Sequence, residues 1–180
     1  MTPREFAFVF FDAARIAELG AEVLGLLGLV DDLHIEVDER MPVSRVTLSE
    51  GPPVVVHAES GAFEDLRKPR AMSDEATTLA LARVLLRLRD RRQGGFAEAP
   101  PDVDLSLPHV AAWDSYSVGR LGRLGLPAHE PRWRYNFRNR HGFTDAADAA
   151  FTELWQADEL AWGAVSAISD GACAVAAGRA

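Results

Sequence analysis

Two pairs of residues in the sequence have the types and spacing of metal ligands. His34 precedes Glu36 by two positions, and His57 precedes Glu59 by two. Side chains two positions apart on a β-strand project from the same face, so the members of each pair would point the same way. Two imidazoles and two carboxylates on one shared face would suit zinc or another transition metal.

The strands that would carry these pairs are not expected to be neighbours. In a simple three-stranded meander, a middle strand with Arg45 and Thr47 separates them by about 10 Å, twice the strand spacing of ~4.8 Å. We therefore interpret Glu36, Arg45 and Glu59 as a solvated ladder of charges with incidental histidines. No metal and no other cofactor is expected.

The stretch RWRYNFRNRHGF, residues 132–143, concentrates arginine and aromatic residues. As a strand it would place Trp133, Tyr135 and Phe137 on one face, and as a helix it would pair Trp133 with Phe137 at a spacing of four. The sequence leaves both open. In either form the rings separate from the guanidinium groups, unlike an exposed aromatic platform that stacks unpaired bases. We expect the three rings to be buried and most of the arginines to pair with carboxylates.

An anion site is the functional alternative for this stretch. Guanidinium groups bind phosphate or carboxylate through two parallel hydrogen bonds. A second set of arginines recurs at a spacing of four on the helix predicted over residues 73–92. The residues of the predicted anion site are Arg134, Arg138, Arg140 and His141, joined by Arg83, Arg87 and Arg91.

Other motifs for catalysis or phosphate binding are weak. No serine lies in a G-x-S-x-G context, and Cys173 has no histidine near it in the sequence. The glycine-rich stretch GRLGRLG, residues 119–125, lacks the G-K-[ST] ending of a phosphate loop and a preceding strand. We interpret its glycines as a close approach between helices or as a fraying helix end.

The elements that position these residues follow from hydrophobic periodicity. Alternating or apolar runs bounded by turn signals predict strands, and they imply a mainly antiparallel three-stranded meander. The helix after them is apolar on two sides, which predicts a buried central helix. The predicted elements are a helix over 12–29, strands over 33–39, 44–49 and 53–60, and a helix over 73–92.

The second half of the chain is predicted to be helical. Residues 94–108 are rich in Gly, Pro and Asp and form a long connection, and helical patterns follow it. The fold class is therefore α+β, with an α+β core over 1–95 and a helical extension over 96–180 that packs on the core as one domain overall. Residues 6–11 fit either a strand or an extension of the first helix.

Composition limits the classes of function. The chain has 180 residues, of which 48% are hydrophobic, and one cysteine, which excludes an intramolecular disulfide and indicates a reducing compartment. The apolar run 6–11 is too short for a signal-peptide core or a membrane span, so we expect a cytoplasmic protein without membrane contact. The net charge of −8 disfavours nucleic acid, and the basic segments 67–95 and 120–140 can pair with the acidic segments between them.

The order of the predicted elements carries one resemblance to a known family. Over residues 12–126 it resembles the layout of minimal zincin metallopeptidases, in which the helix after the sheet bears H-E-x-x-H. The corresponding helix here reads TTLALARVLL and contains neither His nor Glu after Ala76. The resemblance therefore implies a zincin-like domain without its metal site, and it implies no peptidase activity.

We expect a non-enzymatic domain that binds a protein partner, associates with itself or organises a small assembly. The first alternative is an enzyme or binding protein for an anionic small molecule that uses the arginine cluster. The second is a catalytically inactive zincin-like domain. A partner surface should expose apolar groups, whereas a ligand site should be a pocket with convergent guanidinium groups.

Overall fold

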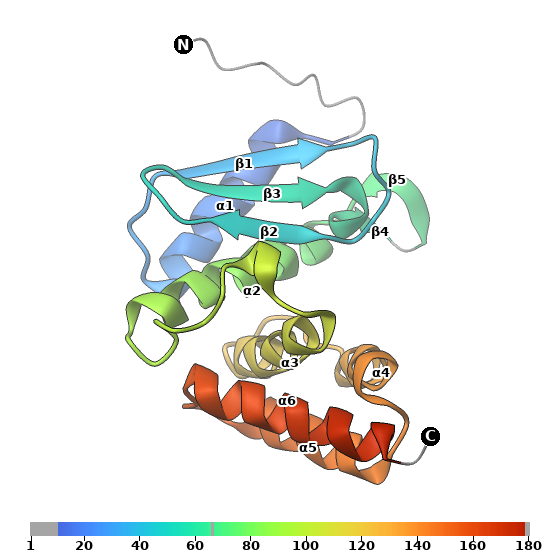
Figure 1. Cartoon of the computed structure of the whole chain (residues 1–180). Helices are drawn as coiled ribbons and strands as arrows, with labels where there is room; N and C mark the ends of the chain where they lie inside the picture. The colour runs from blue at the N-terminus through green and yellow to red at the C-terminus, as the bar shows by residue number, and fades with distance from the viewer. Residues whose placement is uncertain (1–10, 66, 179–180) are drawn as a thin grey trace. The chain divides into compact units, whose positions relative to one another are not determined.

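The computed structural model describes residues 11–65 and 67–178, and its first element is helix α1, Ala13–Leu27 (Figure 1). The side chain of Asp12 accepts hydrogen bonds from the backbone N–H groups of Ala14 and Arg15, which are otherwise unsatisfied at a helix start. Gly28 ends the helix in the left-handed conformation, at φ 66°. Of the segment 6–11, only Phe11 lies within the described residues.

Three strands follow α1: β1 (Leu33–Asp38), β2 (Val46–Ser49) and β3 (Val54–Glu59). Their order in the sheet is β1-β3-β2, with β1 parallel to β3 and β2 antiparallel to β3. The α+β class is confirmed, but the predicted meander is wrong in its strand order. Because β3 lies between β1 and β2, the connection of residues 39–45 crosses the width of one strand.

The two faces of this sheet differ in character. The apolar face carries Val37, Val54, Val56 and other buried side chains, whereas His34, Glu36 and His57 are exposed on the opposite face. A short helical turn, Ser60–Ala62, leads to a two-stranded sheet of β4 (Glu64–Asp65) and β5 (Lys68–Met72) that the sequence does not predict.

Helix α2, Asp74–Arg92, is the predicted central helix, and its burial is confirmed. Leu81, Leu85, Leu86 and Leu88 are all inaccessible to solvent. The chain divides into two compact units, Met1–Leu85 and Leu86–Ala180, so the division falls inside α2 rather than in the Gly/Pro-rich connection where we expected it. That the two parts form one domain stays a prediction.

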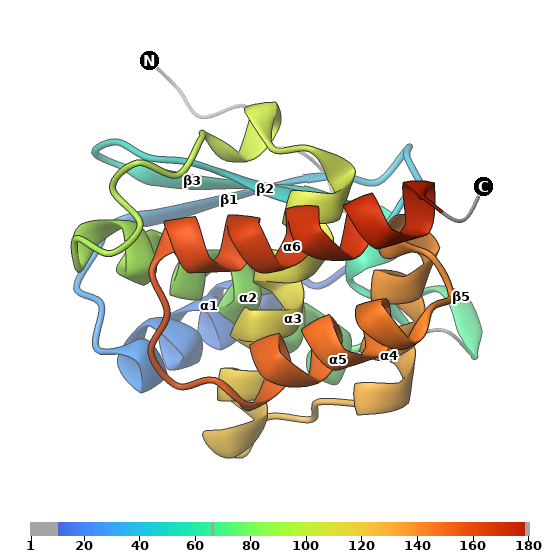
Figure 2. The same cartoon turned by 60° about the horizontal axis from the view of Figure 1, so that its bottom comes forward.

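The second unit is built from helices, as expected. In Figure 2, α6 (red) runs across the front of this unit, beside α5 and α4 (orange). Helix α3 contacts each of the other three, and aromatic residues such as Trp113, Tyr116 and Phe151 fill the core between them. The elements are a short turn at Asp102–Asp104, α3 (Leu107–Arg123), α4 (Glu130–His141), α5 (Asp145–Gln156) and α6 (Trp162–Ala177).

The glycine-rich stretch GRLGRLG contains the close helix approach that was one of its two expected roles. A Cβ atom on Gly119 would collide with the backbone carbonyl of Trp155, so this glycine allows the close approach of α3 and α5. Gly125, at φ 90°, lies just beyond the end of α3.

The basic aromatic stretch forms helix α4, and this corrects one expectation about its rings. Phe137 is fully buried and Trp133 is partly buried, since positions four apart share a helix face. Tyr135 points elsewhere on the helix and is 57% exposed, where it meets the edge of exposed Phe143 at a centroid distance of 5.9 Å. The prediction that all three rings are buried is therefore wrong for Tyr135.

Candidate functional site

The exposed face of the sheet brings two members of the predicted metal set, one from each pair, into contact. His57 Nδ1 lies 2.9 Å from Glu36 Oε2, because Glu36 and His57 are direct neighbours in the register of β1 and β3. The predicted separation of about two strand spacings is therefore wrong. Its premise was a strand between β1 and β3, and β2 instead lies on the far side of β3.

The other two members of the predicted metal set are not drawn into this pair. His34 Nε2 lies 3.8 Å from Asp32, and Glu59 lies 3.6 Å from Arg45 Nη1. Within the described ranges, no group of three or more His, Cys, Asp or Glu side chains is arranged to hold a metal ion. The pairing of Arg45 with Glu59 matches one half of the predicted ladder, whereas Glu36 pairs with a histidine.

His57 also contacts a serine that the sequence analysis does not single out. Ser49 Oγ lies 3.3 Å from His57 Nε2, so hydroxyl, imidazole and carboxylate follow in the order of a nucleophilic triad. Such a triad needs a water-excluded site with donors for an oxyanion. Here the side chains of His57 and Glu36 are 46% and 59% exposed, and Ser49 is exposed too. We therefore interpret the three residues as a solvated cross-strand network.

The arginines of α4 contact carboxylates. Arg138 donates from Nε and Nη2 to the two carboxylate oxygens of Asp148 in α5, at 2.7 and 2.5 Å. These bonds lower the pKa of Asp148. Arg134 donates to Glu130 at 2.8 Å and to Thr152 at 3.2 Å. The bidentate face that an external anion would need on Arg138 is thus occupied by Asp148.

The two remaining α4 residues of the predicted anion site differ in burial. Arg140 is exposed, whereas His141 is 1% exposed. The ring of His141 hydrogen-bonds the carbonyl of Phe137 through Nδ1, at 3.0 Å, and Ser169 through Nε2, at 2.8 Å. Burial lowers the pKa of His141, which favours its neutral form. A neutral, buried imidazole does not attract an anion.

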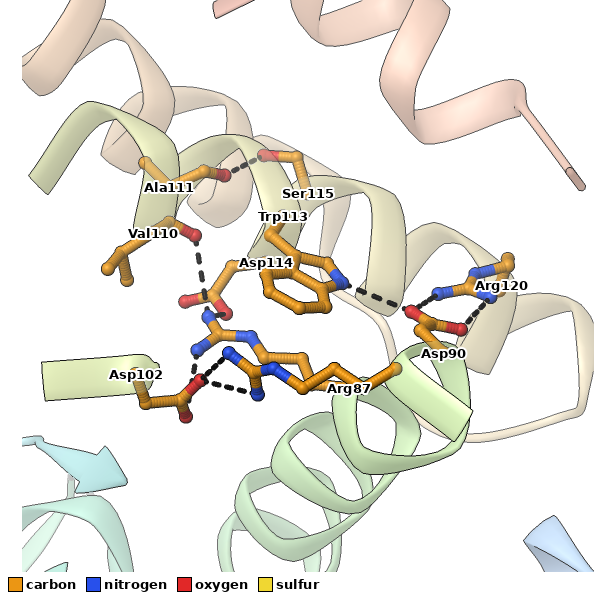
Figure 3. A network of polar contacts seen from close by, with 10 residues as sticks. Arg87, Asp90, Asp102, Val110, Ala111, Trp113, Asp114, Ser115 and Arg120 are labelled. Atoms are coloured by element: carbon orange, nitrogen blue, oxygen red, sulfur yellow. Dashed lines mark hydrogen bonds and ion pairs between the residues drawn. The ribbon is translucent and has the colours of Figure 1, made fainter. Parts of the chain in front are cut away.

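Arg87 lies in a separate, buried network within the second unit (Figure 3). Its guanidinium group pairs with Asp102 at 3.3 Å and with Asp114 at a shorter distance, and it is 2% exposed. Burial, the largest influence, lowers the pKa of Arg87, but the two carboxylates outweigh it and the net shift is upward. Arg91 also pairs with Asp102, at 3.0 Å, whereas Arg83 belongs to the first unit.

Asp90 connects the same part of α2 to α3. Its carboxylate accepts hydrogen bonds from Trp113 Nε1 at 3.1 Å and from two nitrogens of Arg120 at 2.8 and 2.6 Å. The Arg120 guanidinium also lies 3.8 Å from the centroid of the Tyr116 ring. Figure 3 shows the Trp113 indole and the Arg120 guanidinium group of α3 pointing toward the carboxylate of Asp90 in α2. The network anchors the connection and α3 through side chains of the chain itself, and the Nε atoms of Arg87 and Arg120 are buried with no hydrogen-bond partner among the described residues.

An apolar groove of about 270 Å³ lies in the first unit, between α1 and β1. Its floor is formed by half-buried aliphatic side chains, and its α1 side consists mostly of exposed alanines. The residues that line it are Ala13, Ile16, Ala17, Ala21, Leu24, Leu33 and Ile35.

The groove follows an edge of the sheet. Among residues 11–65 and 67–178, β3 is the strand that pairs with β1, and the other side of β1 pairs with none. Backbone N–H and C=O groups point outward along such an edge and can pair with another extended segment. Figure 1 shows β1 at one edge of the three-stranded sheet, with α1 behind the sheet.

Comparisons with protein-family models, with curated protein sequences and with solved structures give no match. The geometry of the site must therefore carry the functional argument. Of the helices that the structure describes, none combines the length and apolar character needed to cross a membrane.

The groove was not predicted from the sequence, although α1 carries a signal of it. Ala13, Ala17 and Ala21 recur at a spacing of four, beside the buried stripe of α1 that contains Ile16 and Leu19. The exposed flank of a helix usually carries long polar side chains. Here three small alanine side chains stand in one row instead. The row leaves space next to β1, but the sequence does not reveal that an edge strand borders it.

Proposed function

We propose that the first unit is a protein-interaction module that binds an extended segment of a partner along the outer edge of β1. The observation that carries this proposal is that an edge strand borders an apolar groove. Strand addition to a sheet edge uses main-chain hydrogen bonds for affinity and pockets beside the edge for specificity.

The two parts of the surface would contribute different energies. Each main-chain hydrogen bond contributes about 0.5–1.5 kcal/mol net, and β1 has six residues along its edge. One apolar side chain buried in the groove contributes about 1.5–3 kcal/mol. Loss of rotational and translational freedom opposes both, which predicts a reversible complex of moderate affinity.

The alternatives receive less support from the geometry. The groove is smaller than the ~300–1,000 Å³ of typical small-molecule sites, and every lining residue is apolar, so it suits an aliphatic side chain better than an anion. Arg138 and Arg87 are paired with carboxylates of the chain. Among the described residues, no group of metal-ligating side chains supports the zincin-like alternative.

The test uses three blocked eight-residue peptides with valine at every second position and lysine, glutamate or threonine at the others. Binding to the full chain is followed by amide chemical shifts of Leu33–Asp38 and by methyl shifts of Leu24, Leu33 and Ile35. We expect at least one peptide to shift both sets of signals. An N-methylated copy of that peptide, which cannot donate to the edge, should bind much more weakly.

A matched pair of variants separates the groove from the rest of α1. Ala17→Gln places a longer polar side chain in the groove and should weaken binding about tenfold, the equivalent of ~1.4 kcal/mol. Ala14→Gln makes the same change on an exposed position of α1 outside the groove and should leave binding unchanged. If no peptide shifts the β1 amides, or if both variants bind equally, the proposed function is wrong.

A further inference from the structure

Resting on this proposed function, we infer that the partner segment alternates apolar with basic side chains. A strand added beside β1 would present successive side chains to opposite faces of the sheet. One set of alternate side chains would therefore face the groove, and the other set would face the polar side of β1. The groove therefore determines which side chains suit one set, and the polar face of β1 determines which suit the other.

The groove side requires apolar groups. Leu33 and Ile35 of β1 form its floor, and the neighbouring side chains of an added strand would lie beside them, over the alanines of α1. Gly20 reinforces this floor, because a Cβ atom there would lie 3.0 Å from Ile35 Cδ1 and 3.3 Å from Leu33 Cδ2. Helix α1 and strand β1 are therefore in close contact beside the groove.

The polar side requires positive charge. The charged side chains of β1 on this face are Glu36 and Asp38, which are 59% and 36% exposed, and Asp32 just before the strand is 80% exposed. Within the described part of the first unit, Glu36 and Asp32 pair with the imidazoles of His57 and His34, and Asp38 pairs with the guanidinium group of Arg40. A carboxylate on an added strand would face like charges across the edge, whereas a lysine would face opposite ones.

The same three peptides decide this inference. At low salt we expect the lysine peptide to bind about three- to tenfold more tightly than the glutamate peptide, with threonine between them, since each opposite-charge pair across strands is worth ~0.2–1 kcal/mol. The preference should shrink in 1 M salt, where exposed charges are screened beyond ~3 Å.

Charge-reversal variants locate the preference on β1. Glu36→Lys should abolish or reverse the ratio of lysine to glutamate affinities, whereas Glu98→Lys, an exposed change of equal charge in the second unit, should preserve it. If the glutamate peptide binds as tightly as the lysine peptide, or if Glu36→Lys leaves the ratio unchanged, the inference is overturned while the proposed function stands. If none of the three peptides shifts the β1 amides, the proposed function itself fails.

Two other occupants of the edge give distinct results. Sedimentation equilibrium would reveal a dimer that Ala17→Gln dissociates if a second copy of the chain occupied the groove. If the chain's own N-terminal segment occupied the groove, a variant lacking residues 1–10 would bind the peptides and the full chain would not. Either result would overturn the inference, and the expected result is a full chain that is monomeric and binds the lysine peptide.

Discussion

Replacement of Asp90 by alanine should destabilise the second unit by about 4 kcal/mol. Asp90 is 4% exposed, and its removal would leave Arg120, at 12% side-chain exposure, without its carboxylate partner. Breaking a buried ion pair on one side costs about 3–5 kcal/mol, and the partial exposure of Arg120 favours the lower end. The indole N–H of fully buried Trp113 would also lose its acceptor, which adds ~1 kcal/mol or more.

The positions of the tryptophans make this change easy to measure. All four tryptophans, at 113, 133, 155 and 162, lie in the second unit. Tryptophan fluorescence, excited selectively at the absorption of the indole rings, therefore reports the unfolding of the second unit and not of the first. With a urea m-value of about 2 kcal/mol/M, the expected loss lowers the urea midpoint by about 2 M.

Two further variants distinguish an unpaired buried charge from a general loss of contacts. The double variant Asp90→Leu, Arg120→Met removes both charges together and should be more stable than Asp90→Ala alone. Asp158→Ala removes a carboxylate that pairs with Arg123 but is 79% exposed, so it should cost only ~0–1 kcal/mol. The reasoning is refuted if Asp90→Ala lowers the midpoint no more than Asp158→Ala does, or if the double variant is the less stable one.

Three further predictions concern the second unit and use the same urea assay. Since burial lowers the pKa of His141, its stabilising contribution is present above the unfolded pKa of ~6.5 and is lost as pH falls toward the folded pKa. The urea midpoint should therefore decrease as the pH is lowered from 7 to 5, and the decrease should be smaller in His141→Gln. An equal decrease in both proteins would contradict this. Gly119→Ala should destabilise by about 1–3 kcal/mol because the new Cβ meets a backbone carbonyl of α5, whereas Gly171→Ala, with open space around it in α6, should stabilise slightly; the reverse order would contradict the close helix approach. Phe137→Ala should cost about 3–5 kcal/mol and Tyr135→Ala far less, and similar losses would contradict their different burial.

Local patterns were sufficient to predict the fold class and the larger elements of the first half of the chain, but not the two-stranded sheet of β4 and β5. The spacing of Ile16, Leu19 and Val23 identifies α1, and the two apolar sides of α2 identify a buried helix, because both signals depend only on residues close in sequence. Strand order depends on which edges meet, and alternation is the same whichever strands pair. One hint was available: the continuous run Val54–Val56 is typical of a central strand.

The environments of the arginines could not be predicted in the same way. Arg87 and Arg91 share a spacing and a residue type, yet their partners, Asp102 and Asp114, come from the later connection and from α3. Helix α4 illustrates the same limit, because its burial pattern follows from packing against α3, α5 and α6. The groove beside β1 depends on tertiary structure too, since its alanines acquire a role only next to an edge strand.

The continuity of α2 across the boundary of the two units restricts how this chain can be cut or recombined. A breakpoint in the Gly/Pro-rich connection at residues 94–101 would separate Arg87, Asp90 and Arg91 from Asp102 and the α3 side chains that they contact. The later fragment would then begin without the cations and the carboxylate around which α3 is arranged. A gene fusion or an expression fragment for the second unit should therefore start upstream of Ser73, so that it inherits the whole of α2.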